Sequence, residues 1–170
     1  METRIRQATA DDVAVAASIL GEAASWLEAR GMAMWRTGET SAERAATDIA
    51  QGLFFLAEHD GEPAGTIKFQ LADDEFWPDV PAGESAFMHR LAVRRRFAGL
   101  GVSTALMTWA VERTRSLGLR YLRLDCEAER RRLRDVYERF GFELHSYRLV
   151  GPYYVSRYQF TIPQERREGP

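Results

Sequence analysis

The hydrophobic pattern of this chain alternates between two periods. Seven short apolar runs have the length and residue types of β-strands. They are Ile5–Ala8, Leu53–Ala57, Ala64–Leu71, Ser85–Val93, Leu119–Asp125, Phe142–Tyr147 and Tyr153–Phe160. Four other segments repeat apolar residues every three or four positions, which predicts amphipathic helices. They are Val13–Leu27, the stretch from Ser41 to Gly52, Val102–Leu117 and Leu133–Phe140.

Local signals mark the ends of these elements. Thr9 with Asp12 has the spacing of a capping box, and Ser41 is a good N-cap for the second helix. Asp60-Gly61 predicts a hairpin turn. Glycines at 118 and 141 are expected to end the last two helices.

The order is therefore strand, two helices, three strands, helix, strand, helix and two strands. We expect an α/β (α+β) fold with a single mixed, mostly antiparallel sheet of six to seven strands and helices on both faces. A length of 170 residues suits one domain, expected over 1–162, followed by a flexible tail at 163–170.

Composition limits the classes of function. Apolar residues make up 45% and charged residues 28%, with a net charge of −2, as in ordinary globular enzymes and not in general nucleic-acid binders. No run approaches the roughly 18–20 apolar residues of a membrane span. Cys126 is the only cysteine, so no internal disulfide and no cysteine zinc site is expected. Together with the lack of a signal peptide, this predicts a cytoplasmic protein without metal or membrane partner.

Candidate chemistry is concentrated where the strand ending at Val93 leads into the helix starting at Val102. Arg94-Arg95-Arg96 is followed by Gly99 and Gly101. A glycine loop before a helix presents backbone N–H groups to an anion at the positive end of the helix dipole. We therefore expect a phosphate compound, with the arginines adding charge-assisted contacts. The alternative is a simple strand-to-helix turn with a solvated arginine run. A dinucleotide fingerprint is disfavoured because Thr104 stands where it needs a third glycine.

The same stretch resembles the signature of the GNAT family of N-acetyltransferases, Q/R-x-x-G-x-G/A. Two registers fit: a literal match that starts at Arg96, and one that starts at Ala98. The distance from Val93 and the helix phase favour Ala98 as the first position. In this register Ala98 replaces the usual Gln or Arg, and Ser103 replaces Gly or Ala.

A second block supports the resemblance. The family carries roughly N-x-x-A-x-x-x-Y-E-x-x-G-F after the next strand, and Tyr137, Glu138, Gly141 and Phe142 match it in spacing. Arg130 replaces the usual Asn, and Leu133 the usual Ala. The resemblance covers about residues 4–160.

The resemblance implies a GNAT-like sheet with splayed central strands and acetyl transfer from acetyl-CoA, the co-substrate, to an amine. The acceptor would be an amine-bearing small molecule or peptide, and family members often form homodimers. Tyr137 matches the tyrosine that protonates the leaving thiolate. The positions that match the family's coenzyme-binding residues are Leu91, Ala92, Val93, Ala98, Gly99, Leu100, Gly101, Val102, Ser103, Thr104 and Arg130.

The general base is less clear from sequence. Phe87 occupies the position of the family's strand glutamate, and His89 shares its strand parity. His89 is the expected catalytic base, and a purely structural histidine is the alternative. Glu84 and Glu127 are further candidates. The buried-strand position predicted for Cys126 argues against a covalent acetyl-enzyme.

Other features suggest how the acceptor binds. An acidic loop could attract a cationic amine, and several large side chains could wall its pocket. The acidic residues are Asp73, Asp74, Glu75, Asp79 and Glu84, and the large ones are Trp26, Met32, Met34, Trp35 and Trp77. A solvated loop and core packing are the structural alternatives. A non-catalytic acyl-CoA-binding module is the second hypothesis for the whole chain, because two signature positions and the strand glutamate are replaced.

Overall fold

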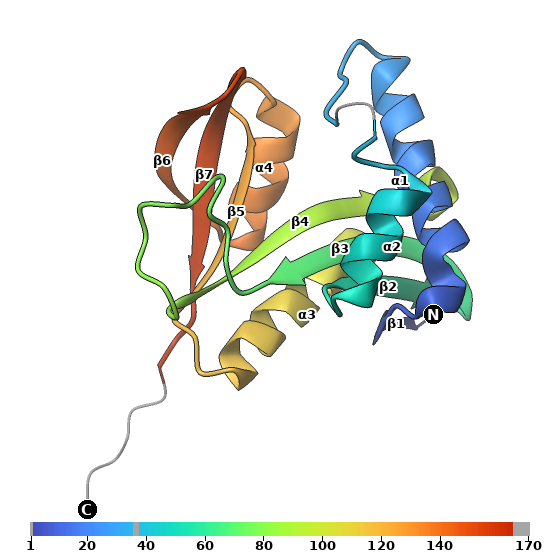
Figure 1. Ribbon diagram of the computed structural model, residues 1–170, viewed down its shortest axis with the longest axis horizontal. Helices are drawn as coiled ribbons and strands as arrows, with labels where there is room; N and C mark the ends of the chain where they lie inside the picture. Colours follow the sequence, from blue (N-terminus) through green and yellow to red (C-terminus); the bar gives the residue numbers. More distant parts are fainter. Residues whose placement is uncertain (1, 36–37, 165–170) are drawn as a thin grey trace, which may run out of the picture. The chain divides into compact units, whose positions relative to one another are not determined.

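The computed structural model describes residues 2–35 and 38–164 (Figure 1). Within them, seven strands form one sheet in the order β1-β2-β3-β4-β5-β7-β6. The strands are β1 (Thr3–Gln7), β2 (Phe54–His59), β3 (Glu62–Gln70), β4 (Ser85–Val93), β5 (Tyr121–Glu127), β6 (Glu143–Val150) and β7 (Tyr153–Thr161). The helices are α1 (Val13–Glu28), α2 (Ala42–Ala50), α3 (Val102–Ser116) and α4 (Arg131–Phe140), with 3₁₀ turns η1 (Ala10–Asp12) and η2 (Arg95–Phe97).

The sheet is mixed and mostly antiparallel, as the sequence predicts. β2 pairs antiparallel with both β1 and β3, and β7 pairs antiparallel with both β5 and β6. Along Ser85–Phe87, β4 runs parallel to Tyr121–Arg123 of β5. The chain divides into two compact units, Met1–Phe69 with Met88–Trp109, and Gln70–Phe87 with Ala110–Pro170.

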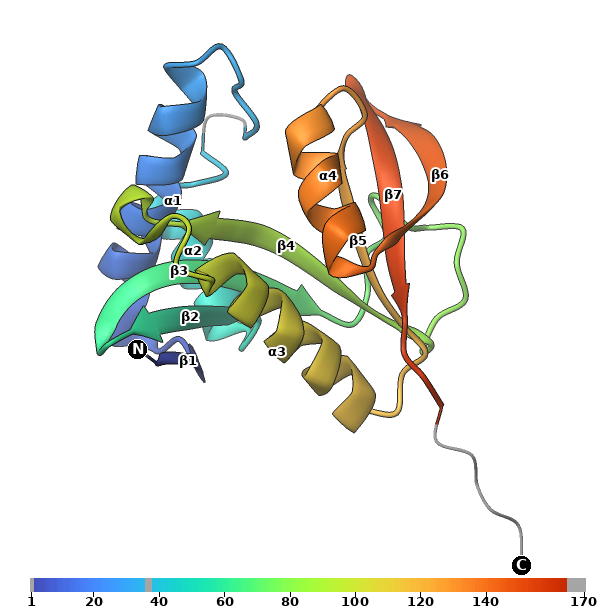
Figure 2. The ribbon, with the colours of Figure 1, turned by 180° about the vertical axis from the view of Figure 1, so that it is seen from behind.

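In the first unit, α1 and α2 lie on one face of β1–β3 and the start of α3 lies on the other (Figures 1 and 2). The predicted helix face of α1 is buried at Ala16, Ile19 and Leu20. The capping box is present, with the Thr9 N–H donating to the Asp12 carboxylate at 2.8 Å. The N-cap of α2 is also confirmed, since the Ser41 hydroxyl accepts from the Arg44 N–H at 3.2 Å.

In the second unit, α4 packs on β5, β7 and β6 (Figure 2). Alternate residues of β5, Leu122 and Leu124, are fully buried, as is Tyr158 of β7. The predicted strand Leu119–Asp125 was wrong by two residues at both ends, because β5 runs over Tyr121–Glu127. Other predicted ends also differ, among them the start of α4, which is Arg131 and not Leu133, and the end of β6, which is Val150 and not Tyr147. The segment before Tyr121 instead leaves the helix through Gly118, in the left-handed conformation.

Among the described residues no helix is both long and apolar enough to cross a membrane. The flexible tail predicted at 163–170 lies mostly outside the described residues, which end at 164.

Candidate functional site

The end of β4 is distorted at a residue that is not glycine. Arg90 has a φ of +54°, in the left-handed region that L-residues rarely adopt. The hydroxyl of Thr66, which is fully buried, donates to the Arg90 carbonyl at 2.8 Å. Such strain in a strand re-aims the backbone groups that follow it, and it clusters at functional sites. Leu91–Val93 are those groups here.

A close packing contact fixes this strand end against the start of α3. A Cβ on Gly65 of β3 would lie 2.8 Å from the Ala92 carbonyl oxygen. It would also lie 3.2 Å from Val102 and 3.1 Å from Leu106. Only glycine allows this approach, so β3, β4 and α3 together hold the two ends of the intervening loop.

The glycine loop has the conformation that an anion cradle needs. Gly99 and Gly101 have φ values of +77° and +81°, and no atom lies within 4 Å of the Cβ position of either. α3 begins directly after Gly101. The N–H groups of Val102–Thr104, in its first turn, have no acceptor within a helix. Open space above the glycines and free donors beside them fit a pyrophosphate.

Three loop N–H groups donate to carbonyls of the same loop, the first being that of Phe97, which donates to the Arg94 carbonyl at 2.9 Å. The Ala98 N–H donates to the Arg95 carbonyl at 3.1 Å, and the Leu100 N–H donates to the Phe97 carbonyl at 3.3 Å. We expected the Ala98 N–H to be left for phosphate, and in this structure it closes the η2 turn instead.

The three arginines of the loop contact protein groups. Arg94 pairs with Glu22 at 2.8 Å, and Arg96 pairs with Glu62 at 2.5 Å. The Arg95 guanidinium lies over the Trp26 ring, 3.9 Å from its centroid. In this structure the three arginines therefore contact α1 and β3, and their phosphate contacts stay a prediction.

Tyr137, from the second unit, lies on the inner face of α4 and is 6% exposed. Its ring contacts those of Phe142 and Tyr158, at centroid distances of 5.9 and 6.3 Å. Burial raises the pKa of Tyr137 well above its usual value, and the nearby Cys126 and Asp125 add to this. A phenol keeps its proton at neutral pH even at its ordinary pKa, so the hydroxyl is protonated as a proton donor must be.

Comparison with known proteins agrees with this geometry. The family model for the acetyltransferase (GNAT) family matches residues 20–142. The chain belongs to the GNAT acetyltransferase family. It is 32% identical over 146 residues to the uncharacterized N-acetyltransferase YesJ of Bacillus subtilis, covering 78% of this chain and 77% of that protein.

Solved GNAT structures share the fold. PaiA N-acetyltransferase from Thermoplasma acidophilum, solved with coenzyme A, gives a TM-score of 0.73 at 16% identity, covering 94% of this chain and 100% of that one. The protein yncA from Salmonella typhimurium, solved with acetyl-CoA, gives 0.70 at 18% identity, covering 97% and 96%. The GNAT fold and the acyltransferase class are thus those that the two sequence blocks imply.

The remaining predicted site residues of this GNAT chain lie on different elements. His89 is half-buried on β4 of the first unit, and Phe87, at the family's glutamate position, is 4% exposed. Arg130, at the N-terminus of α4, pairs with Glu127 at 2.8 Å. This ion pair occupies the Glu127 carboxylate, one of the alternative bases.

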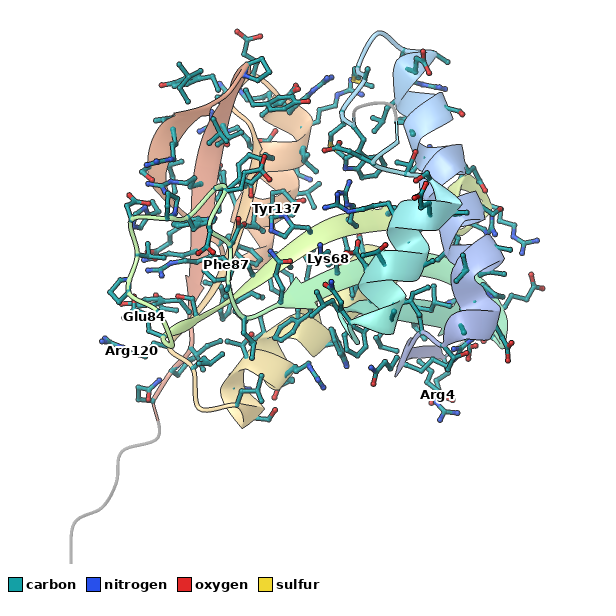
Figure 3. The ribbon with its side chains drawn as sticks, viewed as in Figure 1. Arg4, Lys68, Glu84, Phe87, Arg120 and Tyr137 are labelled. Atoms are coloured by element: carbon teal, nitrogen blue, oxygen red, sulfur yellow. The ribbon has the colours of Figure 1, made fainter. Side chains whose placement is uncertain are left out.

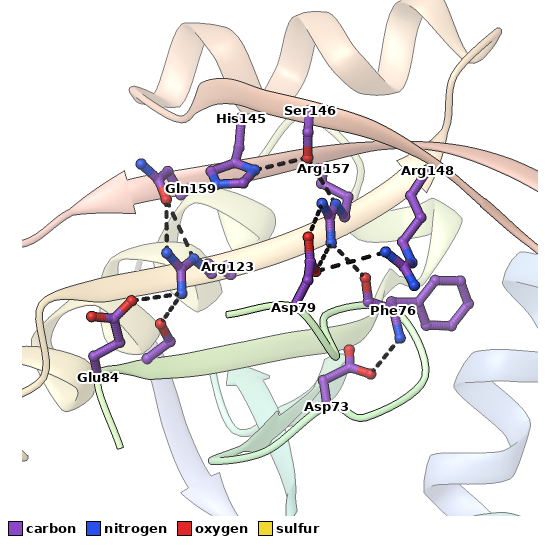
Figure 4. A network of polar contacts seen from close by, with 11 residues as sticks. Asp73, Phe76, Asp79, Glu84, Arg123, His145, Ser146, Arg148, Arg157 and Gln159 are labelled. Carbon is purple, nitrogen blue, oxygen red and sulfur yellow. Dashed lines mark hydrogen bonds and ion pairs between the residues drawn. The ribbon is translucent and has the colours of Figure 1, made fainter. Parts of the chain in front are cut away.

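Glu84 and Asp79 of the acidic loop also have arginine partners (Figure 4). Asp79 forms two hydrogen bonds with Arg157, at 2.6 and 3.0 Å, which hold the pKa of its carboxyl well below the usual range. Glu84 pairs with Arg123 at 3.3 Å. These two carboxylates therefore attach the loop to β5 and β7. Their role is structural, whereas one interpretation of the sequence was an acidic rim that attracts a cationic acceptor.

Trp77 anchors the same loop. It is 2% exposed, with the guanidinium carbons of Arg157 and Arg123 at 4.5 and 5.2 Å from its ring centroid. Trp77 is thus a core residue, whereas Trp26 and Trp35 are half-buried.

Cys126 is buried on β5, as predicted, with its sulfur 3.3 Å from the Ser156 hydroxyl. Burial raises the pKa of the Cys126 thiol to about 11. A thiol that stays protonated at neutral pH is a poor nucleophile, which agrees with transfer without an acetyl-enzyme.

Proposed function

We propose that this protein transfers the acetyl group of acetyl-CoA directly to a primary amine of a small molecule or peptide. The observation that carries the proposal is the sequence of backbone features from Arg90 to Val102. A left-handed residue in β4 is followed by two left-handed glycines with open space beside them and then by the first turn of α3.

The coenzyme would be held mainly by backbone groups. The N–H and C=O groups of Leu91 and Val93 would pair with the pantetheine arm, and one N–H would polarise the thioester carbonyl. The Ala92 carbonyl faces Gly65 of β3 instead. The N–H groups of Gly99 and of Gly101–Thr104 would hold the pyrophosphate. Ser103, half-buried in the first turn, has a hydroxyl that could add a phosphate contact.

The reaction needs two proton transfers. The neutral amine attacks the thioester carbon and then loses a proton, so a C–N bond forms and the C–S bond breaks. The departing thiolate takes a proton from the Tyr137 hydroxyl. The amine proton goes to the base and is later exchanged with water, which also restores Tyr137.

We assign the base to His89. The alternatives Glu84 and Glu127 are both engaged in ion pairs, at 3.3 Å with Arg123 and at 2.8 Å with Arg130. The ion pairs occupy the carboxylate oxygens that would have to accept the proton. Imidazole is the most common general base in enzymes.

The test is thiol release from acetyl-CoA across a panel of amines, with mass spectrometry of the acetylated product. We expect turnover on at least one amine class, and much slower turnover in His89→Gln and Tyr137→Phe. Coenzyme binding without turnover on any amine would favour a non-catalytic acyl-CoA-binding module. An absence of coenzyme binding would contradict both.

A further inference from the structure

A single carboxylate on α1 contacts the loop that precedes the glycines. One oxygen of Glu22, Oε1, accepts from the backbone N–H of Arg95 at 3.0 Å. The other oxygen, Oε2, accepts from Nη1 of Arg94 at 2.8 Å. Glu22 and these residues are more than 70 positions apart in sequence, so the contact joins α1 to the start of the loop.

Arg94 extends this attachment to β3. Its Nε donates to the Pro63 carbonyl at 3.2 Å, and its backbone N–H donates to the Ala64 carbonyl at 2.8 Å. Its Nη2 donates to the Ser18 hydroxyl of α1 at 3.2 Å. The guanidinium thus has one contact on β3 and two on α1, and it is largely withdrawn from solvent, with a side-chain exposure of 17%.

The Glu22 carboxylate is ionised under ordinary conditions. The hydrogen bond from the Arg95 N–H lowers its pKa most, and the contact with Arg94 lowers it further. A charged acceptor forms a stronger hydrogen bond with a backbone N–H than a neutral one does. Trp26, one turn further along α1, holds the Arg95 guanidinium over its ring at 3.9 Å.

We propose that Glu22 is a positioning residue for the coenzyme loop; this inference rests on the proposed function. Glycines at 99 and 101 make the loop conformationally permissive, so ordering it costs entropy when a ligand binds. Fixing the start of the loop before binding reduces that cost. Glu22 provides the attachment without touching the coenzyme.

The test is calorimetric titration with coenzyme A of the wild-type chain and of Glu22→Ala and Glu22→Gln. Loss of both contacts in Glu22→Ala should weaken coenzyme A binding about tenfold, and KM for acetyl-CoA should rise by the same factor while kcat stays constant. Glu22→Gln retains an acceptor for the Arg95 N–H but loses the charge beside Arg94. Its affinity should therefore lie between those of the wild type and Glu22→Ala.

Glu62→Ala is the matched control. It removes the carboxylate that pairs with the neighbouring Arg96, but both side chains are exposed, at 59% and 61%. An exposed ion pair contributes little to structure. Coenzyme A affinity should therefore be unchanged, although the same net charge is lost next to the loop.

Thermal unfolding of each variant separates positioning from folding. A folded Glu22→Ala chain with wild-type affinity for coenzyme A would overturn the inference, as would an equal loss of affinity in Glu62→Ala. If the wild-type chain binds no coenzyme A, the proposed function fails first and this inference with it. Wild-type binding with unaltered binding by Glu22→Ala would overturn this inference alone.

Discussion

The two units of the molecule provide different kinds of functional group. In the first, the candidate coenzyme site consists of backbone: the left-handed Arg90, the open Gly99 and Gly101, and the N–H groups that begin α3. In the second, the candidate acid is one side chain, the buried Tyr137. Tyr137 is labelled in Figure 3. Two other residues of the same helix, Arg134 and Glu138, both bind the Tyr158 hydroxyl.

This difference predicts which departures from the family signature leave coenzyme binding intact. At Ser103 the backbone N–H is the predicted phosphate ligand, and at Ala98 the N–H closes the η2 turn, so we expect these two replacements to change coenzyme affinity little. A change at Tyr137 would remove the functional group itself. Within the 98–104 loop, side-chain substitutions should therefore have small effects on coenzyme affinity, whereas loss of the Tyr137 hydroxyl should have a large effect on kcat.

The largest expected effect is in Tyr137→Phe. Losing the hydroxyl should lower kcat about 100-fold, the lower range for a general acid, with KM for acetyl-CoA unchanged. Steady-state kinetics measure both. Tyr158→Phe is the control: its hydroxyl contacts Arg134 at 2.8 Å and Glu138 at 2.6 Å, so its loss should lower stability more than kcat. Equal kcat values in Tyr137→Phe and the wild type would remove Tyr137 from the chemistry.

Arg157→Met should lower the free energy of unfolding by about 2 kcal/mol, because Arg157 is 3% exposed and binds Asp79, Ser146 and the Phe76 carbonyl. Chemical denaturation measures this free energy. The pKa of Asp79 is lowered in the folded state. The ion pair of Asp79 therefore stabilises the fold at pH values above the ordinary carboxyl pKa, and this stabilisation is lost as the pH falls through the pKa of the folded state. The difference between wild type and variant should therefore shrink in acid. A difference independent of pH would contradict the role of Asp79.

Gly101→Ala tests the backbone of the first unit. A Cβ at φ +81° is strained and occupies the open space of the cradle, so coenzyme A affinity should fall about tenfold. Gly118→Ala is the matched control, at φ +72° with no atom within 4 Å of its Cβ position, at the other end of α3. It should lose a similar amount of stability and no affinity. Equal affinity losses in the two variants would argue against the cradle.

The smallest effect should be that of Ser103→Ala. If backbone N–H groups dominate, losing this hydroxyl should change coenzyme A affinity less than about threefold, below the value of a typical hydrogen bond. Calorimetry measures the affinity. A loss larger than that of Gly101→Ala would show that side chains, and not backbone, hold the coenzyme.

Much of the fold follows from local sequence signals. The β4 strand has both predicted ends, Ser85 and Val93, and α2 has its predicted cap at Ser41, because burial alternation and capping chemistry act over a few residues. The two sequence blocks also predicted the GNAT family, which the family model confirms. The register of the glycine motif stays a prediction.

The features that the sequence does not predict depend on residues that are far away in the chain. Nothing in the residue type of Arg90 indicates a left-handed conformation, which is supported by Thr66 of another strand. The arginines at 94 and 96 resemble phosphate ligands until Glu22 and Glu62 are brought beside them by the fold. The sequence does contain a signal for a buried ion pair at Arg123, because this charged residue stands between two buried leucines. Its partners are distant in the chain and could not be predicted from the sequence.

The most direct test of the central claim is a titration of ¹⁵N-labelled protein with coenzyme A, following the backbone amide signals. We predict saturable shifts that are largest for Gly99 and for Gly101–Thr104, together with Leu91–Val93. The control amide of Gly118 should not move. Binding that leaves the 99–104 amides unshifted, or an absence of binding at millimolar coenzyme, would contradict the account.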